Sequence, residues 1–168
     1  PYPVRKKLSY GTADSEFLRD AVPMTKEEVR EVSICKLKLH EQAVVYDVGS
    51  GSGSVAVEIA GISHSIQVYA IERKPEAVAL MCKNREKFHA YNMDIIEAFA
   101  PEGLEELPVP THAFLGGTGG KLQEILKCLY QKNPQMRIVI NAVTLETVGE
   151  IREALAHFPV ADESMVQL

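Results

Sequence analysis

The chain has 168 residues, of which 46% are hydrophobic and 24% are charged, so it fits one soluble domain large enough to bury a core. Its apolar stretches fall well short of the roughly 20 residues that a membrane helix needs. The formal net charge of −5 argues against a nucleic-acid surface, because phosphate binding depends mainly on Lys and Arg.

Cysteine and histidine give no sign of a metal site. Cys35, Cys82 and Cys128 lie far apart in helical patterns, form no CxxC pair and are expected to be small core residues. The histidines are scattered, and no secretory signal begins the chain, so we expect a cytoplasmic protein. Because the first residue is Pro1 rather than methionine, we expect an excised domain or a processed chain.

Residues 1–42 are predicted to form an irregular arm and one helix that pack on a core spanning residues 43–168. The helix is expected in TKEEVREVSICKLKL (25–39), where Thr25 and Glu28 have the spacing of a capping box. The arm before it contains YGTADSEF and AVPM. It begins with a basic cluster that is most simply a solvated surface: Arg5, Lys6 and Lys7.

From residue 43 onward, strand and helix patterns alternate. Strands are predicted at 43–49, 66–72, 90–96, 111–116 and 137–143, the last apolar enough for a central position. The helices between and after them have apolar faces at helical spacing: Val78, Met81 and Phe88; Leu122, Ile125, Leu126 and Leu129; Val148, Ile151 and Leu155. The closing SMVQL predicts a strand that stops in mid-course. This alternation predicts an α/β fold, a doubly wound and mostly parallel sheet.

The first glycine-rich turn, DVGSGSGS (47–54), follows the first predicted strand and leads into a helix. Glycine allows close backbone approach to a ligand, and a helix start offers unpaired N–H groups to an anion. No GK[ST] follows, which argues against a P-loop. Gly51, Gly53 and Ala56 fit the GxGxxA pattern of a dinucleotide site. Asp47, the glycines and Glu72 at the next strand end instead favour S-adenosylmethionine. A carboxylate at the position of Glu72 can accept hydrogen bonds from the ribose hydroxyls.

A second glycine-rich turn, LGGTGG (115–120), follows the fourth predicted strand. In a doubly wound sheet this turn lies beside the first one, at the point where ligands bind. A tight turn alone would explain one glycine, whereas four leave room for a large ligand. Methyltransferases that modify amino nitrogens typically carry [ND]PP[YFW] here. Its absence disfavours nitrogen acceptors.

Four stretches taken together resemble the decarboxylating precorrin C15-methyltransferases of the cobalamin pathway: AVPMTKEEVR, VVYDVGSGSGSVAVE, THAFLGGTGGKLQEIL and IVINAVTLET. This family includes the cobalt-precorrin-6B enzymes of anaerobic routes and the C-terminal domain of the aerobic precorrin-6Y methylases. The resemblance spans residues 10–168. It implies a class I S-adenosylmethionine-dependent, Rossmann-like methyltransferase. Its relatives form tetramers, and some are fused to a C5-methylating domain, so a homo-oligomer and a longer parent chain are expected.

The resemblance also implies the site residues. The donor is expected at Thr25, Asp47, Gly49, Ser50, Gly51, Ser52, Gly53, Glu72, Ala98 and Phe99. Phe99 departs from the acidic residue that the family shows near the adenine. The adenine amino group must then be met by backbone or water, or that contact is lost. The macrocycle is expected to lie on Gly116, Gly117, Thr118, Gly119 and Gly120, with Asn141 and Thr144 facing the same pocket.

The family reaction implies loss of CO₂ from the C12 acetate of a tetrapyrrole and methylation at C15. The conjugated ring can supply both the electron sink and the carbon nucleophile, so no catalytic metal is expected and the protein mainly positions the reactants. No general base is assigned, and Glu146 is expected to be an exposed carboxylate at a helix start. Substrate carboxylates are expected to meet Arg5, Lys6, Lys7, Arg19 and Lys26 if the arm folds over the site.

Two other hypotheses stay open. The same fold and donor could serve another acceptor, either a small molecule or RNA, although the acidic charge and the missing proline–aromatic motif weigh against nucleic acid. The chain could also be a non-catalytic module that binds S-adenosylmethionine or a dinucleotide, and Phe99 is the residue that most favours this hypothesis.

Overall fold

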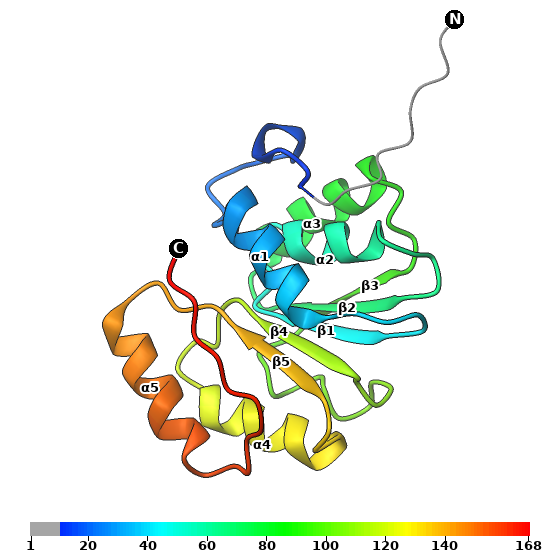
Figure 1. Cartoon of the computed structure of the whole chain (residues 1–168). Coiled ribbons are helices and arrows are strands. Elements are labelled where there is room, and N and C mark those ends of the chain that lie inside the picture. Colours follow the sequence, from blue (N-terminus) through cyan, green and yellow to red (C-terminus); the bar gives the residue numbers. More distant parts are fainter. Residues whose placement is uncertain (1–10) are drawn as a thin grey trace, which may run out of the picture.

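The computed structural model describes residues 11–168 as a parallel sheet between two layers of helices (Figure 1). The strands are β1 (Val44–Val48), β2 (Gln67–Glu72), β3 (Met93–Glu97), β4 (His112–Leu115) and β5 (Arg137–Ile140). The helices are the 3-10 turn η1 (Asp14–Glu16), α1 (Glu27–Leu37), α2 (Ser54–Ala60), α3 (Pro75–Lys87), α4 (Leu122–Lys132) and α5 (Leu145–Leu155).

The sheet has the order β3-β2-β1-β4-β5, and every neighbouring pair is parallel. The predicted doubly wound fold is confirmed. Strands β2 and β3 lie on one side of β1, and β4 and β5 lie on the other. The loops after β1 and β4 therefore lie at the switch point where such folds bind ligands. Val48 pairs with Leu115 there, so the strands end side by side.

Helices α1, α2 and α3 cover one face of the sheet, and α4 and α5 cover the other (Figure 1). One core cluster lies under α1 to α3, and a second lies under α4 and α5 and includes Ala100 and Leu104 from the loop after β3. The predicted inner face of α4 is confirmed, because Leu122, Ile125, Leu126 and Leu129 are all buried. In α3 the buried face is rotated, since Ala77, Leu80, Met81 and Asn84 lie inside.

Strand β5 was expected to be central but lies at an edge of the described sheet. Its apolar character has another cause: both of its faces are covered. Val139 packs against the cluster under α1, while Ile138 and Ile140 pack against the cluster under α4 and α5. The expected final strand is also wrong. Residues 164–168 form no ladder, and Met165, Val166 and Leu168 are mostly exposed.

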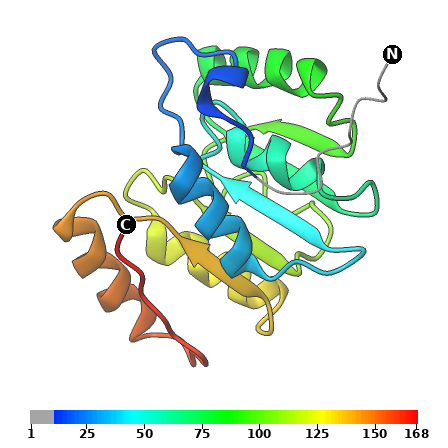
Figure 2. The same cartoon turned by 45° about the horizontal axis from the view of Figure 1, so that its top comes forward.

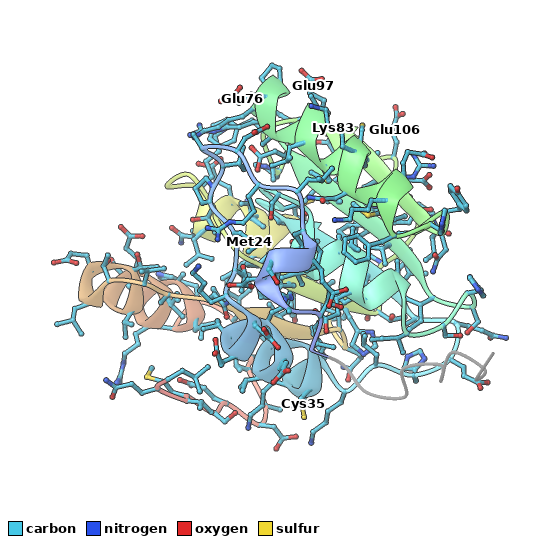
Figure 3. The ribbon with its side chains drawn as sticks, turned by 90° about the horizontal axis from the view of Figure 1, so that it is seen from above. Met24, Cys35, Glu76, Lys83, Glu97 and Glu106 are labelled. Carbon is cyan, nitrogen blue, oxygen red and sulfur yellow. The ribbon has the colours of Figure 1, made fainter. Side chains whose placement is uncertain are left out.

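Two of the three cysteines lie outside the core, whereas Cys128 packs against the cluster under α4 and α5. Cys35 and Cys82 are exposed and Cys128 is partly buried. In Figure 3, Cys35 points away from the molecule at the outer surface of α1. Small side chains in a helix fit either face, and the buried face of α1 is made by its neighbours Ser33, Ile34 and Leu37.

Candidate functional site

The first glycine turn, residues 49–53, joins β1 to α2 at the carboxyl edge of the sheet. Gly49, Gly51 and Gly53 have φ angles of 72°, 57° and 78°, a region that other residues rarely adopt. The N–H groups of Gly49 and Ser50 donate to the carbonyl of Ile71, at 3.0 and 3.1 Å, which fastens the turn to β2. The turn is therefore a built structure that holds main-chain groups at the edge of the sheet.

Asp47 and Ser52 place buried polar atoms at this turn that have no partner. Asp47 is fully buried, and its Oδ2 accepts a hydrogen bond of 2.6 Å from the Ser50 hydroxyl. Its Oδ1 and the Ser52 hydroxyl have no hydrogen-bond partner. Burial raises the pKa of the Asp47 carboxyl to about 7; the Ser50 hydroxyl and the main-chain N–H of Ala56 offset part of this rise, and the nearby Glu72 carboxylate adds to it. Orphaned buried oxygens are costly, and they suit a site that a polar ligand completes.

Glu72, at the end of β2, is 8% exposed and faces the first turn. Its Oε2 accepts from the N–H of Gly51 at 2.9 Å. Its Oε1 accepts from the N–H groups of Arg73 and Lys74 at 2.9 and 3.0 Å. The carboxylate thus lies where the sequence placed it, one strand away from the glycines and fixed by three main-chain donors.

The second glycine turn, residues 116–120, touches the first one directly. The N–H of Gly116 donates to the carbonyl of Val48 at 2.9 Å. A Cβ added at Gly49 would lie 2.2 Å from the carbonyl oxygen of Gly117, so no side chain fits between the two turns. The prediction that they share one edge is confirmed, and the glycine at 49 is explained by the second turn.

The other glycines of the second turn differ in what surrounds them. A Cβ at Gly119 would meet the ring of Phe99 at 2.7 Å, whereas nothing lies within 4 Å of the corresponding positions at Gly117 and Gly120. Gly120 has a φ of 83°, which itself favours glycine. Gly117 needs glycine for neither reason, because its φ is not positive and its Cβ position is open. The turn therefore leaves open space beside Gly117.

The N-terminal segment, residues 11–26, passes over α2 and α3 and leads into α1 (Figure 2). A Cβ at Gly51 would lie 2.9 Å from the carbonyl oxygen of Pro23, so this segment closes one side of the turn. A cavity of about 220 Å³ lies between the segment and the start of α3. It is lined by Asp20, Ala21, Val22, Pro23, Lys74 and Glu76.

Two buried residues that sequence reasoning missed hold this segment in place. Arg30 is fully buried, its Nε lies 2.6 Å from Glu58 Oε2, and its guanidinium also reaches Asp14 and the carbonyl of Thr12. Asn84 accepts from the N–H of Leu18 at 2.8 Å and donates to the carbonyl of Ser52 at 2.9 Å, which joins the segment to the first turn. One signal was available: Arg30 has the same helical spacing as the buried residues of α1.

Thr25 does not cap α1. The helix begins at Glu27, and its N-cap is Lys26, which makes no side-chain cap bond. The Thr25 carbonyl instead accepts from Arg30 Nη1 at 2.7 Å, which keeps the chain extended through Lys26 and shifts the helix start by one residue from the predicted capping box. Its role toward a donor stays a prediction.

The residues after β5 lie at the same edge of the sheet, but the side chains of Asn141 and Thr144 already form hydrogen bonds within the protein. Asn141 Oδ1 accepts from the Ser33 hydroxyl of α1 at 3.1 Å. The Thr144 hydroxyl caps α5 by accepting from the N–H of Thr147 at 3.2 Å. Glu146 is exposed at this helix start. Hydrogen bonds from its own N–H and from Thr144 lower its pKa, so it is held as a carboxylate.

The loop after β3 brings Ala98 and Phe99 to the edge. The N–H of Ala98 donates to the carbonyl of Glu72 at 3.0 Å, so the loop starts beside the Glu72 carboxylate. The half-buried Phe99 ring faces two cations rather than a carboxylate: Arg73 and Lys121, whose charged groups lie 4.5 and 4.1 Å from its centroid.

The cations expected to meet an acidic substrate are only partly placed. Arg5, Lys6 and Lys7 lie outside the described residues. Arg19 is exposed on the N-terminal segment. Lys26 lies 3.4 Å from Asp14 and is 58% exposed. Within residues 11–168, no helix is long and apolar enough to cross a membrane.

Comparison with known proteins bears on this site. The sequence matches the precorrin methyltransferase domain family over residues 15–159. A probable cobalt-precorrin-6B C(15)-methyltransferase (decarboxylating) from Sulfurisphaera tokodaii is 44% identical over 86% of this chain and 77% of its own length. The enzyme of that name from Salmonella typhimurium is 38% identical over 92% of this chain and 81% of its own length.

A solved structure is similar throughout most of the chain. The precorrin-6y C5,15-methyltransferase from Geobacter metallireducens superposes with a TM-score of 0.84 at 40% identity. The match covers 88% of this chain and 79% of that one.

Proposed function

The chain belongs to the precorrin methyltransferase family, and from this membership and the geometry of its site we propose that it methylates a precorrin during cobalamin biosynthesis. The proposed reaction places a methyl group from S-adenosylmethionine on C15 of a precorrin or cobalt-precorrin. The acetate side chain on C12 loses its carboxyl group as CO₂. The names of the relatives specify the same position and the same decarboxylation.

One observation carries the proposal most directly, which is the contact between the two glycine turns at the switch point. The open space lies beside Gly117, and Gly117 itself is in contact with Gly49 of the first turn. A donor on the first turn and an acceptor on the second would then meet across this contact. Methyl transfer needs such an arrangement, because the two reacting atoms must be held close and in line.

The residues of the first turn fit S-adenosylmethionine, which supplies an electrophilic methyl group on a sulfonium. The positive-φ glycines let main-chain groups approach a ligand closely. Glu72 has carboxylate oxygens at the position where ribose hydroxyls are held in doubly wound folds. The unpaired Oδ1 of Asp47 and hydroxyl of Ser52 give polar atoms that the donor could satisfy directly or through water.

The second turn supports the acceptor side of the proposal. Gly117 and Gly120 have open space where side chains would stand, which suits the approach of a wide, flat ring. Thr118, between them, is partly exposed and offers a hydroxyl to the rim of that ring. We infer that Asn141 and Thr144 border the same space through main-chain groups, because their side chains already bond to Ser33 and Thr147.

The protein contributes positioning and shelter in this proposal. The lowered pKa of Glu146 keeps its carboxylate ionised and makes it a poor proton acceptor at neutral pH, so we assign it no role as a base. The N-terminal segment, fixed by Arg30 and Asn84, covers the side of the first turn at Gly51. It would exclude water from the donor, as a methyl transfer requires.

The test is incubation of the protein with S-adenosylmethionine and precorrin acceptors, with and without cobalt, followed by mass spectrometry. We expect a product that has gained one methyl group and lost CO₂. Calorimetry with S-adenosylhomocysteine and with NAD forms the parallel arm. Binding of the former without any product from either acceptor would refute the precorrin assignment and leave a methyltransferase with another acceptor. Binding of NAD alone would refute the donor.

A further inference from the structure

The ring of Phe99 lies where three loops of the carboxyl edge meet. Arg73, from the loop after β2, places its guanidinium carbon 4.5 Å from the ring centroid. Lys121, at the end of the second glycine turn, places its Nζ 4.1 Å from the same centroid. Cations at these distances are attracted to the face of an aromatic ring. One ring in the loop after β3 thus contacts Arg73, which follows the Glu72 carboxylate, and Lys121, which follows the second glycine turn.

Gly119 adds a direct contact between this ring and the second turn. A Cβ at that position would lie 2.7 Å from Cε2 and 3.1 Å from Cζ of Phe99, and 3.6 Å from an Arg73 nitrogen. The main chain of the turn therefore rests against the ring. Since packed groups of this kind cannot shift independently, the place of Phe99 constrains the place of the turn.

Ion pairing does not account for the arrangement. Two like charges on one ring repel each other, so neither cation is there to neutralise the other. Lys121 Nζ lies 3.3 Å from a Glu102 oxygen, but Glu102 is 72% exposed and such a pair holds weakly. Among the residues that the structure describes, no carboxylate forms an ion pair with Arg73. The ring is therefore the shared anchor of both cations.

Arg73 also connects the ring to the carboxylate assigned to the donor. The main-chain N–H of Arg73 donates to Glu72 Oε1 at 2.9 Å, while Glu72 Oε2 accepts from the main-chain N–H of Gly51 at 2.9 Å. An unbroken series of contacts thus runs from the first glycine turn through Glu72 and Arg73 to Phe99. From Phe99 it continues to Gly119 and Lys121 of the second turn.

We propose that Phe99 is a positioning residue that couples occupancy of the donor site to the position of the second glycine turn. The inference rests on the proposed function in one respect, because it takes a donor to bind against Glu72 and the first turn. A ligand that holds Glu72 restricts Arg73 and the ring, and the ring restricts the turn. Donor binding then orders the acceptor surface. By linkage, the acceptor must strengthen donor binding by the same factor.

Hydrogen exchange with S-adenosylhomocysteine as the probe tests this coupling without any acceptor. In the unaltered protein we expect the ligand to slow exchange of the amides in 49–53 and also in 116–121. Phe99→Leu keeps apolar volume but removes the ring face. With the probe at a concentration that saturates this variant, it should show protection at 49–53 and lose it at 116–121. Phe99→Tyr keeps the ring and should behave like the unaltered protein. A ring that served only as core packing would not produce this split.

Arg73→Met gives a second variant in case Phe99→Leu does not fold, since Arg73 is exposed and its loss leaves the ring in place. It should also remove protection at 116–121 alone. Protection of 116–121 that persists in either folded variant, or is absent from the unaltered protein with ligand bound, would overturn the coupling and leave the proposed function standing. Failure of the unaltered protein to bind the probe at all would refute the donor assignment and this inference with it.

Discussion

At the scale of single residues, some residues of the site are explained by the stability of the fold and others are not. Asp47 and Gly117 illustrate the second kind. Asp47 is a buried carboxyl with an unpaired oxygen, and Gly117 is a glycine that neither backbone angle nor packing requires. Features that weaken the folded chain without a structural reason are the ones expected at a binding site.

Asp47 should make stability fall as pH rises. Its pKa is about 7 in the folded protein against an ordinary value of 3.8, so between these values the folded state holds a proton that the unfolded state has released. The free energy of unfolding contributed by this group therefore decreases through that window and is constant above it. Asp47→Asn removes the proton exchange, so its stability relative to the unaltered protein should increase with pH. Urea unfolding at several pH values across the window measures this.

Asp14→Asn is the control of opposite sign. Burial raises the pKa of Asp14, but hydrogen bonds and charge from Arg30 and Lys26 outweigh it, so the net pKa is lowered. Its stabilisation is present above the ordinary pKa and is lost as pH falls through the lowered one. Asp14→Asn should therefore destabilise the protein most at neutral pH. For Asp47→Asn, a difference in the free energy of unfolding that is the same at every pH would contradict the raised pKa of Asp47.

Gly117→Ala should separate folding from turnover. The Cβ enters open space at an ordinary φ, so the free energy of unfolding should stay the same or increase by up to about 1 kcal/mol. The same methyl group would stand where the acceptor is proposed to lie, so turnover should fall about tenfold or more. Unfolding curves and product formation are measured together.

Gly149→Ala is the matched control, because Gly149 lies within α5 and also has nothing within 4 Å of its Cβ position. It should raise stability in the same way and leave turnover unchanged. Equal turnover in the two variants would remove Gly117 from the acceptor surface.

At the scale of elements, the N-terminal segment depends on one buried side chain. Arg30→Ala leaves Glu58, which is almost fully buried, without its cation, a change that typically costs about 3–5 kcal/mol. Because Pro23 lies on Gly51, loosening the segment should also weaken binding of S-adenosylhomocysteine. Calorimetry below the unfolding temperature checks the second effect.

Lys26→Ala serves as the comparison for Arg30→Ala. Lys26 pairs with the same Asp14 but is 58% exposed, so its removal should change stability by no more than about 1 kcal/mol. If Arg30→Ala lowers stability while ligand affinity is unchanged, the segment does not shape the donor site.

The order and kind of the elements could be predicted because the hydrophobic residues of each strand and helix repeat with the spacing typical of that element. The inner face of α4 and the glycine turns after β1 and β4 follow from local pattern and from the rules of doubly wound sheets. What failed depends on tertiary and side-chain contacts that the local hydrophobic pattern does not encode. The start of α1 moved because Arg30 draws the Thr25 carbonyl, and β5 is apolar because helices cover both of its faces.

The same reason explains the site residues that were missed. Asn84 and Arg30 act through contacts with Leu18, Ser52 and Glu58, none of which is near them in the chain. Phe99 stands where the resemblance leads one to expect a carboxylate near the adenine. Only the fold reveals that this ring meets Arg73 and the second turn.

At the scale of the whole molecule, apolar surface gathers at one end of the sheet. Strand β5 is an edge strand, and Val143, Leu145, Met165 and Val166 beyond it are 50% to 96% exposed. Open edges and exposed apolar groups favour pairing with another chain. The homo-oligomer expected from the family resemblance stays a proposal, and this end of the sheet is the surface through which we propose that it forms.

Sedimentation velocity over a range of concentrations tests the association. We expect a species larger than a monomer, and we expect Met165→Ser with Val166→Ser to shift it toward the monomer. Tyr91→Ser, at an exposed position just ahead of β3 at the other edge of the sheet, should leave the distribution unchanged. A monomer at every concentration would contradict the proposal.

The contact between Gly49 and Gly117 has a consequence for how such enzymes can diverge. It joins two main chains and leaves no room for a side chain at Gly49, whereas the Cβ position of Gly117 points into open space. A side chain at position 49 is therefore excluded by the main chain of the second turn, whereas Thr118 in that turn already carries one. Under the proposed function, residue 118 can therefore vary with the acceptor while residue 49 stays glycine.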